Sequence, residues 1–494
     1  MSTRRFRGIY KILRLALGVA VAAVLLVALM IQFRIRVAND WQMYAKLPAA
    51  KAPTKAESII VFAPHTDDET LGCGGLLAMA HENGARVRVV LMTNGDGFWF
   101  AASRTYQTVR LTPDRFISFA CRRQTETLKA LAIDGIGPSQ VTFLGYPDRG
   151  LSPLWSRYWS SDKLYTSKST KLDYSPYANS FTFHAPYCGE SVLKDVGTIL
   201  KQTMPTDIYV PHPLDNHPDH YATYCFVMAA IEQLRSEGYA FAGKIKTHTY
   251  LVHRGDWPAP RGEDSRLPLA PPHAMTGGDT KWESLALPAD IVRLKLRAIK
   301  QYKTQANVEK GFLMSFSRSN ELFGLMPDRT VSRVAPGAIT VDGDIEDWQG
   351  IPPAVVDPVG DYVVAGMSRG GDVRAIYACT DSANLYIRID CVRNLSPRIR
   401  YTVSLRGIND RGSDGYYTVS IKPRTAQSTG SSDWAYKANV MEIALPLRKL
   451  KLDSNLFIQV QTSTMRLAID NTGWHGLDLK TPKTSEKPVG KRPV

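Results

Sequence analysis

Apolar and polar positions along residues 58–250 alternate between short strand-like and longer helix-like segments. An apolar run at 58–63 predicts a buried strand, the pattern at 68–83 predicts a helix, and a second apolar run at 86–92 predicts another strand. A strand, a helix and a strand in such close succession form a βαβ unit, which implies a parallel sheet. The alternation continues, with helices expected at 114–133, 190–203, 219–236 and 288–306 and strands at 141–144, 207–211 and 245–252.

The pattern changes after about residue 335, where short alternating runs replace the strand–helix series. These runs predict strands at 374–379, 385–391, 400–405, 416–421, 438–444 and 456–463. Strands at this spacing, separated by turn residues, are typical of a β-sandwich. The polar stretch 477–494 is expected to be a disordered tail.

The N-terminal segment is apolar without interruption from Leu15 to Ile31, and basic residues precede it. A helix of this length spans about 26 Å, near the lower limit for crossing a bilayer. The segment is therefore expected to be a transmembrane signal anchor, with the N-terminus in the cytoplasm and the rest of the chain outside. A cleaved signal peptide is the alternative, although no small-x-small cleavage site follows the run closely.

These patterns divide the chain into five parts. They are a basic segment and membrane anchor at 1–36, a linker at 37–55, an α/β domain at 56–335, a β-sandwich at 336–476 and the tail at 477–494. The expected fold class is α/β, with a Rossmann-like, mostly parallel sheet and flanking helices, plus the C-terminal all-β sandwich and the N-terminal transmembrane helix. Six cysteines in 494 residues are too few for a disulfide scaffold.

The formal charge of +15 does not by itself indicate a nucleic-acid partner, because it is unevenly distributed. Residues 1–36 carry seven Lys and Arg and no Asp or Glu, which leaves +8 for the rest of the chain. Membrane topology explains basic residues beside an apolar run. The expected exposed elements carry no basic stripe with interleaved aromatic residues, so nucleic acid is not an expected partner.

Two polar clusters follow two of the predicted strands. The segment APHTDDE at 63–69 comes at the end of the first strand, and HPLDNHPDH at 212–220 comes directly after the strand at 207–211. Ligand sites of parallel α/β sheets gather outside these strand ends, so the clusters could meet in space. A His/Asp/His triad drawn from them would give Zn²⁺ three protein ligands and leave one position for water, as in hydrolytic zinc sites.

A simpler interpretation treats each cluster as a polar turn. Asp68 would then cap the following helix, and Asp219 would cap the helix at 219–236. Two clusters at two strand ends of one domain favour the metal hydrolase over this alternative.

The first cluster extends into APHTDDETLGCGG at 63–75, which resembles the signature of the LmbE-like or PIG-L deacetylase family. That signature is (A/P)HPDDE followed by a glycine-rich helix start. HPDH at 217–220 is similar to the family's second motif, and the resemblance covers residues 57–305. Thr66 stands where the family usually has a proline that is not itself a ligand.

The resemblance implies Zn²⁺-dependent hydrolysis of an N-acetyl group, commonly on an N-acetylglucosamine unit. It implies that His65, Asp68 and His220 hold Zn²⁺ or another divalent metal. It also implies that Asp67 is the general base for the zinc-bound water. His217 would stabilise the oxyanion or donate to the leaving amine.

Four further residues are candidates for supporting roles. Asp219 could orient His217 or His220 rather than cap a helix. Asp96 could contact sugar hydroxyls or occupy a turn. Arg123 and Glu126 lie one turn apart on a predicted helix, where they would form a surface pair or serve the substrate side. The aromatic residues that could form a sugar-stacking platform are Trp99, Tyr146, Trp155, Tyr158 and Trp159.

The start of the β-rich region, VDGDIEDW at 341–348, resembles the opening of carbohydrate-binding sandwich modules of the family-nine type. The later segment YACTDSANLYIRID is similar to their central hairpin. The resemblance implies a module that tethers the enzyme to a glycan. Asp342, Asp344 and Asp347 are candidates for binding Ca²⁺, and a polar loop that opens a β domain is the simpler explanation.

The sequence as a whole predicts a membrane-anchored zinc-dependent N-deacetylase. Its catalytic domain would lie outside the membrane and act on an envelope glycan, an exopolysaccharide or a glycolipid. One alternative is a non-catalytic glycan-binding protein with a vestigial metal site, and another is a zinc hydrolase of a different N-acyl amide. Asp67 and His217 argue against the first alternative, because binding alone needs neither residue.

Overall fold

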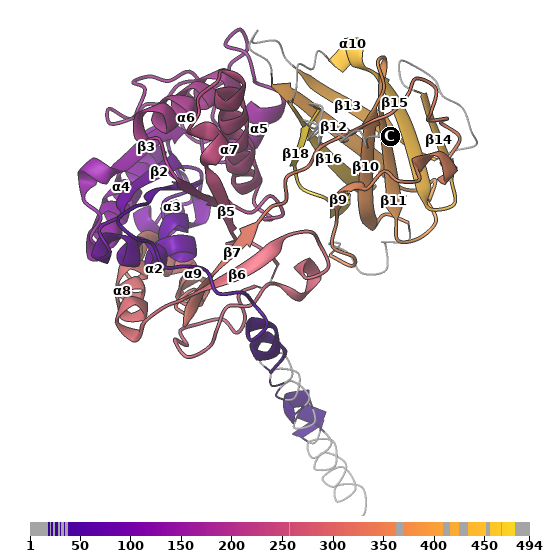
Figure 1. The fold of residues 1–494 in the computed structure, drawn as a ribbon. Helices are drawn as coiled ribbons and strands as arrows, with labels where there is room; N and C mark the ends of the chain where they lie inside the picture. The colour runs from indigo at the N-terminus through magenta and orange to yellow at the C-terminus, as the bar shows by residue number, and fades with distance from the viewer. Residues whose placement is uncertain are drawn as a thin grey trace, which may run out of the picture.

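The computed structural model describes residues 38–255, 257–361, 370–408, 415–423, 433–450, 455–465 and 467–479, with a few separate positions between 18 and 34. Figure 1 shows an α/β domain beside a β-rich domain. The predicted anchor at 15–31 lies largely outside the described residues, as does the tail beyond residue 479. Among the residues that are described, no helix is both long and apolar enough to cross a bilayer.

The α/β domain is built on a seven-stranded sheet in the order β3-β2-β1-β4-β5-β7-β6. Its five parallel strands are β3 (Val141–Tyr146), β2 (Arg86–Thr93), β1 (Ser58–Ala63), β4 (Asp207–Pro211) and β5 (Lys246–Tyr250). β7 (Asn320–Leu325) and β6 (Lys281–Ala286) add an antiparallel edge. The prediction of a mostly parallel sheet is therefore confirmed, whereas the antiparallel edge was not predicted.

Helices cover both faces of this sheet (Figure 1). One face carries α2 (Asp68–Glu82), α4 (Pro113–Ile133) and α8 (Ala289–Ile299), and the other carries α5 (Leu151–Ser156), α6 (Gly189–Thr203) and α7 (Pro218–Ser236). Alternate residues of β1 enter two separate cores, since Val61 packs with the first set and Phe62 with the second. Burial on both faces explains why β1 is apolar throughout.

The predicted single helix at 288–306 is wrong. The chain forms α8 and then a separate helix, α9 (Lys303–Met314). Tyr302 lies between them with its side chain fully buried, and its hydroxyl contacts Glu69 and Thr70. Burying this ring beside the start of α2 accounts for the break. The short helix α3 (Trp99–Tyr106) was also not predicted.

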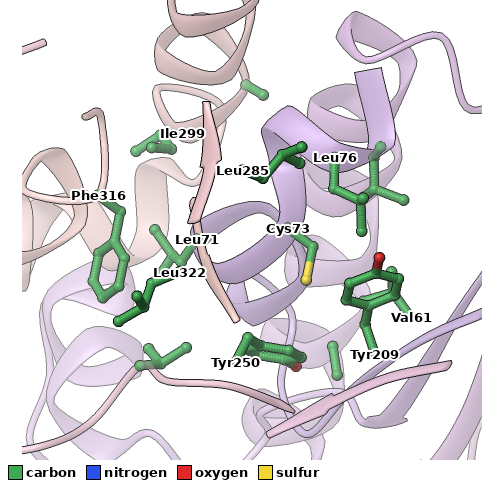
Figure 2. Close-up of a cluster of buried hydrophobic side chains, with 14 of the residues drawn as sticks. Val61, Leu71, Cys73, Leu76, Tyr209, Tyr250, Leu285, Ile299, Phe316 and Leu322 are labelled. Atoms are coloured by element: carbon green, nitrogen blue, oxygen red, sulfur yellow. The ribbon is translucent and has the colours of Figure 1, made fainter. Parts of the chain in front are cut away.

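The core around α2 fixes the helix that carries the first polar cluster. Figure 2 shows Leu71, Cys73 and Leu76 of α2 among the buried side chains of the neighbouring strands. Gly72 permits a close approach, because a Cβ at this position would lie 2.3 Å from the Tyr250 ring. The N-terminal half of α2 is therefore held tightly against β5.

A buried ion pair also anchors α2. Lys295 Nζ of α8 lies 2.6 Å from Glu321 Oε1 of β7, and both side chains are fully buried. Lys295 also donates to the Leu71 carbonyl, and Glu321 accepts from the N–H groups of Gly75 and Leu76. These further hydrogen bonds of the pair all go to the backbone of α2.

Replacing Lys295 with methionine is expected to lower the free energy of unfolding by about 3–5 kcal/mol, because it leaves the Glu321 carboxylate buried without its cation. Urea denaturation measures the change. The matched control is Lys300→Met, which removes an exposed ion pair with Glu263 and should cost less than about 1 kcal/mol. Equal effects of the two substitutions would contradict the anchoring role of Lys295.

The C-terminal domain consists of two mostly antiparallel sheets. The first contains β8 (Ser332–Arg333), β9 (Pro353–Val356), β10 (Val373–Thr380), β11 (Asn384–Cys391), β14 (Asp433–Lys437) and β15 (Val440–Pro446). The second contains β12 (Arg400–Ile408), β13 (Tyr416–Ile421), β16 (Asn455–Thr464), β17 (Leu467–Asn471) and β18 (His475–Asp478). One hydrophobic core takes residues from both sheets, for example Ile387 and Val403, so the sheets pack face to face.

Aromatic residues join the two domains. Trp155 of α5 contacts Phe457 and Trp474 of the sandwich edge to face, with ring centroids 5.4 and 5.9 Å apart. The Arg406 guanidinium of β12 lies 4.2 Å from the centroid of the Trp159 ring and 5.2 Å from that of Trp155. Both tryptophans are buried here, so the expected sugar-stacking role is wrong for them.

Candidate active site

The topology brings the two polar clusters together. β1 pairs in parallel with β4, in the register Ile59 to Asp207, so both strands end at the same edge of the sheet. His65 follows β1 and α2 begins at Asp68, while the second cluster runs from the end of β4 into α7. This edge is where ligand sites of parallel sheets form.

One carboxylate oxygen links the three residues that were expected to hold a metal. Asp68 Oδ2 lies 3.1 Å from His65 Nδ1 and 3.0 Å from His220 Nε2. All three side chains are buried. Neither ring nitrogen of His220 makes a well-directed hydrogen bond, although a carboxylate oxygen lies close to each. Two imidazoles and one carboxylate are a donor set that suits Zn²⁺, so these residues fit the metal.

In His65 and His220, the ring nitrogen that does not face Asp68 lies close to another carboxylate. His65 Nε2 lies 3.2 Å from Asp219 Oδ2 and 3.4 Å from Asp148 Oδ1. His220 Nδ1 lies 3.1 Å from Asp215 Oδ2. Carboxylates in this position fix the orientation and tautomer of a metal-binding histidine.

Asp219 therefore contacts His65 rather than His217 or His220 through its carboxylate. The same carboxylate accepts hydrogen bonds from the N–H groups of Arg149 and Leu151, and His217 is the N-cap residue of α7. The helix-capping alternative for Asp219 is consequently wrong. The carboxylate ties the loop after β3 to the start of α7.

Three residues that were not expected in the site, Asp148, Asp215 and His253, lie in it. Asp215 Oδ2 accepts from the N–H groups of Val252 and His253 as well as facing His220. The His253 ring lies 4.8 Å from that of His220, centroid to centroid. Asp215 lies inside the second polar cluster, and His253 follows β5. Both positions come after strand ends, and this could have identified the two residues as site candidates from the sequence.

Asp67 has an unusual backbone conformation, with a φ of 128°. Non-glycine residues in this region are strained and cluster at functional sites. Its Oδ2 lies 3.5 Å from Arg123 Nη2, and its side chain is 12 % exposed compared with 2 % for Asp68. Burial raises the pKa of the Asp67 carboxyl well above its usual value, and the Arg123 guanidinium opposes this shift.

His217 is positioned through its Nδ1 atom, which accepts a hydrogen bond of 3.2 Å from the Asp219 N–H. Its ring lies 4.6 Å from the His65 ring, centroid to centroid. Burial lowers the pKa of His217 well below its usual value, and positive charge on His65 and His220 lowers it further. Because Nδ1 accepts this hydrogen bond, the ring proton of His217 is on Nε2.

Arg123 and Glu126 are both buried and do not pair with each other. Arg123 donates to the carbonyls of Gly95 and Thr66, at 2.9 and 2.8 Å. Glu126 accepts from the N–H and hydroxyl of Thr304 at the start of α9. The surface-pair interpretation is therefore wrong, and Arg123 supports the loop that carries Asp67.

Asp96 also lies within the protein rather than on a sugar-binding surface. It is fully buried, and it accepts from the Asp148 N–H at 3.2 Å and from the Tyr177 hydroxyl at 2.8 Å. Burial first, and then the nearby Asp148 carboxylate, raise the pKa of Asp96 to about 7. The Asp96 carboxylate therefore holds the backbone of Asp148 in place.

Replacing Asp96 with asparagine is expected to change how stability depends on pH. The native pKa is raised, so the stability contributed by Asp96 is present at low pH and is lost as pH rises from about 4 to about 7. Asparagine stays neutral, so the mutant should match the wild type near pH 4 and exceed it at pH 8, by up to about 4 kcal/mol. Urea denaturation across this range measures the difference, and parallel stability curves would contradict it.

A groove borders the histidine cluster. It has a volume of about 670 Å³, within the range of small-molecule sites. Its lining includes Asn216, His253, Arg254, Arg261 and Phe312. Of the site residues described above, His253 lines this groove.

Residues 60–231 match the model of the PIG-L family, described as GlcNAc-PI de-N-acetylase. No curated protein matches the chain.

Several solved structures are similar to part of the chain. A conserved protein from Thermus thermophilus is 19% identical, with 52% of this chain and 84% of that chain covered and a TM-score of 0.31. The N,N'-diacetylchitobiose deacetylase from Pyrococcus horikoshii is 17% identical, with 56% and 86% covered and a TM-score of 0.36. The A40926 pseudoaglycone deacetylase is 18% identical, with 55% and 96% covered and a TM-score of 0.34.

The family match spans both polar clusters and the strands that carry them. Residues 60–231, which hold both polar clusters, are therefore similar to the PIG-L family of deacetylases.

Proposed function

We propose that this protein is a zinc-dependent hydrolase that removes N-acetyl groups from N-acetylglucosamine-type units of a glycan or glycolipid. The observation that carries the proposal is the placement of Asp68 Oδ2 within 3.1 Å of a ring nitrogen of both His65 and His220. The description of the matching family supplies the substrate class.

His65, Asp68 and His220 would hold the metal. When bound there, Zn²⁺ supplies Lewis acidity, which acidifies water and polarises a carbonyl oxygen. Asp215 and Asp219 keep the two imidazoles in the tautomers that binding requires.

Asp67 acts as the general base. Its carboxylate takes a proton from the attacking water, and its side chain is the more exposed of the two adjacent aspartates. Arg123 holds it in place through the Thr66 carbonyl and the ion pair of 3.5 Å. The protonated carboxyl can then return the proton to the leaving amine.

His217 stabilises the negative charge that develops on the acetyl oxygen. Its neutral ring presents the Nε2–H group as a hydrogen-bond donor, because the Asp219 N–H occupies Nδ1.

Acetate release from a panel of N-acetylated substrates tests the function. The panel contains N-acetylglucosamine, chito-oligosaccharides and N-acetylglucosaminyl-phosphatidylinositol, each with the full-length chain in detergent and added Zn²⁺. Zinc-dependent acetate release from one member supports the proposal. No release from any member, by a protein shown to contain zinc, would favour hydrolysis of another N-acyl amide or binding without catalysis.

The sandwich offers a feature that would suit glycan binding. A groove of about 770 Å³ is lined by Tyr386, Trp434 and Tyr436 together with Asp433 and Asn384. The rings of Trp434 and Tyr436 are nearly parallel, with centroids 6.1 Å apart, and both are partly exposed. Trp434→Ala should weaken retention on an immobilised glycan without changing turnover of a soluble monosaccharide.

We also propose that residues 15–31 anchor the chain in a membrane with the catalytic domain outside. The support is the uninterrupted apolar run behind a basic flank. Protease accessibility of an epitope at the C-terminus, in intact cells or spheroplasts, tests this orientation.

A further inference from the structure

A second cluster of carboxylates lies in the sandwich, outside the active site. Asp357, Asp361 and Asp470 each offer one oxygen atom, and these atoms all lie within 4.8 Å of one another. Asp357 directly follows β9, and Asp470 is on β17 in the opposite sheet. The cluster therefore joins segments that are far apart in the sequence.

Two of these carboxylates have oxygens that are buried without a hydrogen-bond partner. Asp357 is 1 % exposed, and neither of its side-chain oxygens has a partner. Asp361 Oδ1 is also buried without one, while its Oδ2 accepts a hydrogen bond of 2.6 Å from Arg254 Nη2. Asp470 accepts from the N–H groups of Val373 and Asn471. Buried polar atoms are normally satisfied, so these oxygens point to a missing partner.

The charge of the cluster indicates the nature of that partner. Asp372 adds a fourth carboxylate nearby, and Arg254 is the cationic side chain that contacts the group. Burial first, then Asp470 and Asp361, raise the pKa of Asp357 well above its usual value. Like charges packed this closely in a buried place repel one another, and a cation between them would remove the repulsion.

We infer that Asp357, Asp361 and Asp470 bind a divalent cation of the calcium type. All the available ligand atoms are carboxylate oxygens, which suit hard cations rather than zinc. Calcium binds oxygens at about 2.3–2.6 Å, so ligands on opposite sides of the ion lie up to about 5 Å apart. The three oxygens lie close enough together for one ion to approach all of them.

The loop that was expected to bind Ca²⁺ is not this site. Asp344 Oδ2 pairs with Lys437 at 2.7 Å, and Asp347 Oδ2 accepts from the Thr340 N–H. Among the described residues, Asp342, Asp344 and Asp347 do not form a group with close ligand atoms. The two places thus provide a candidate site and a matched control within one domain.

The inferred site lies where the two domains meet. Arg254, which Asp361 holds, follows His253 of the active site and donates through Nη1 to the Leu214 carbonyl at 2.8 Å. Leu214 lies in the second polar cluster. A cation at this site would fix the loop after β9 against β17 and would hold Asp361 in place for Arg254.

Equilibrium dialysis with radioactive Ca²⁺ tests the inference on the full-length chain in detergent, after chelation and reloading with zinc to fill the active site. We expect one Ca²⁺ per chain. Asp357→Asn and Asp470→Asn should each weaken binding by at least about tenfold. Asp344→Asn should leave binding unchanged. No binding at millimolar Ca²⁺, equal binding by all variants, or a preference for Mg²⁺ would overturn the assignment.

Thermal unfolding gives a second readout, in which Asp357→Asn should act in opposite directions with and without calcium. In a calcium chelator that leaves zinc bound, the mutant should melt higher than the wild type, because it removes a repelling buried charge. In Ca²⁺, the wild type should gain at least about 5 °C and the mutant should not. A mutant that melts lower than the wild type by the same amount in both conditions would indicate a purely structural role and overturn the inference.

Discussion

Replacing Asp67 with asparagine is expected to lower kcat for acetate release about 10³-fold, because it removes the general base. Asparagine has nearly the same shape as aspartate, so the substitution adds no steric strain at the φ of 128°. The loop held by Arg123 should therefore keep its structure. Zinc content, measured by mass spectrometry, should stay at one ion per chain. The lower kcat would then come from the missing general base and not from a loss of zinc.

The control for Asp67 is Asp134→Asn. Asp134 is a buried aspartate of the same domain, beyond the end of α4, and its carboxylate oxygens have no hydrogen-bond partner. This substitution should leave kcat unchanged. An Asp67→Asn variant that kept a tenth or more of the wild-type kcat would show that another group takes the proton.

Replacing His220 with alanine is expected to abolish both zinc binding and acetate release. His220 is one of three protein donors, and its removal leaves two donors in a site that also contains several carboxylates. Zinc content should fall from one ion per chain to nearly none at micromolar zinc. Asp215→Asn should have a smaller effect, about 10–100-fold in zinc affinity, because Asp215 only orients the imidazole.

His212 provides the matched control for His220. It belongs to the same polar cluster and is equally buried, but its ring stacks on Trp282 and its Nε2 contacts the Thr280 hydroxyl. His212→Ala should lower thermal stability and keep the full zinc content. Loss of zinc in His212→Ala, or retention of zinc in His220→Ala, would contradict the assigned ligand set.

The parts of this fold that could be predicted from the sequence are those with a local cause. β1 and β4 are buried on both faces and therefore appear as continuous apolar runs. The polar segments that follow them had to meet once the strands were parallel neighbours. The break between α8 and α9 has no such local signal, because it depends on the distant contacts of Tyr302 with Glu69 and Thr70.

The same distinction applies to the site. His65, Asp68 and His220 lie in short polar segments that a reader of the sequence can find. Asp148 and His253 each follow a different strand, and only the order of strands in the sheet shows that they join the cluster. The sugar-stacking prediction is wrong for Trp155 because its ring partners, Phe457 and Trp474, lie some three hundred residues further along the chain. Trp159 is likewise covered by the distant Arg406.

The aromatic contact between the domains has a consequence for how a long glycan would be modified. Trp155 and Arg406 join the two cores, so the sandwich is fixed to the catalytic domain and does not swing on a linker. A polymer held in the groove beside Trp434 would present its residues to the active site at one constant distance. The unit at that distance from the held segment would then be the one that the proposed deacetylase modifies.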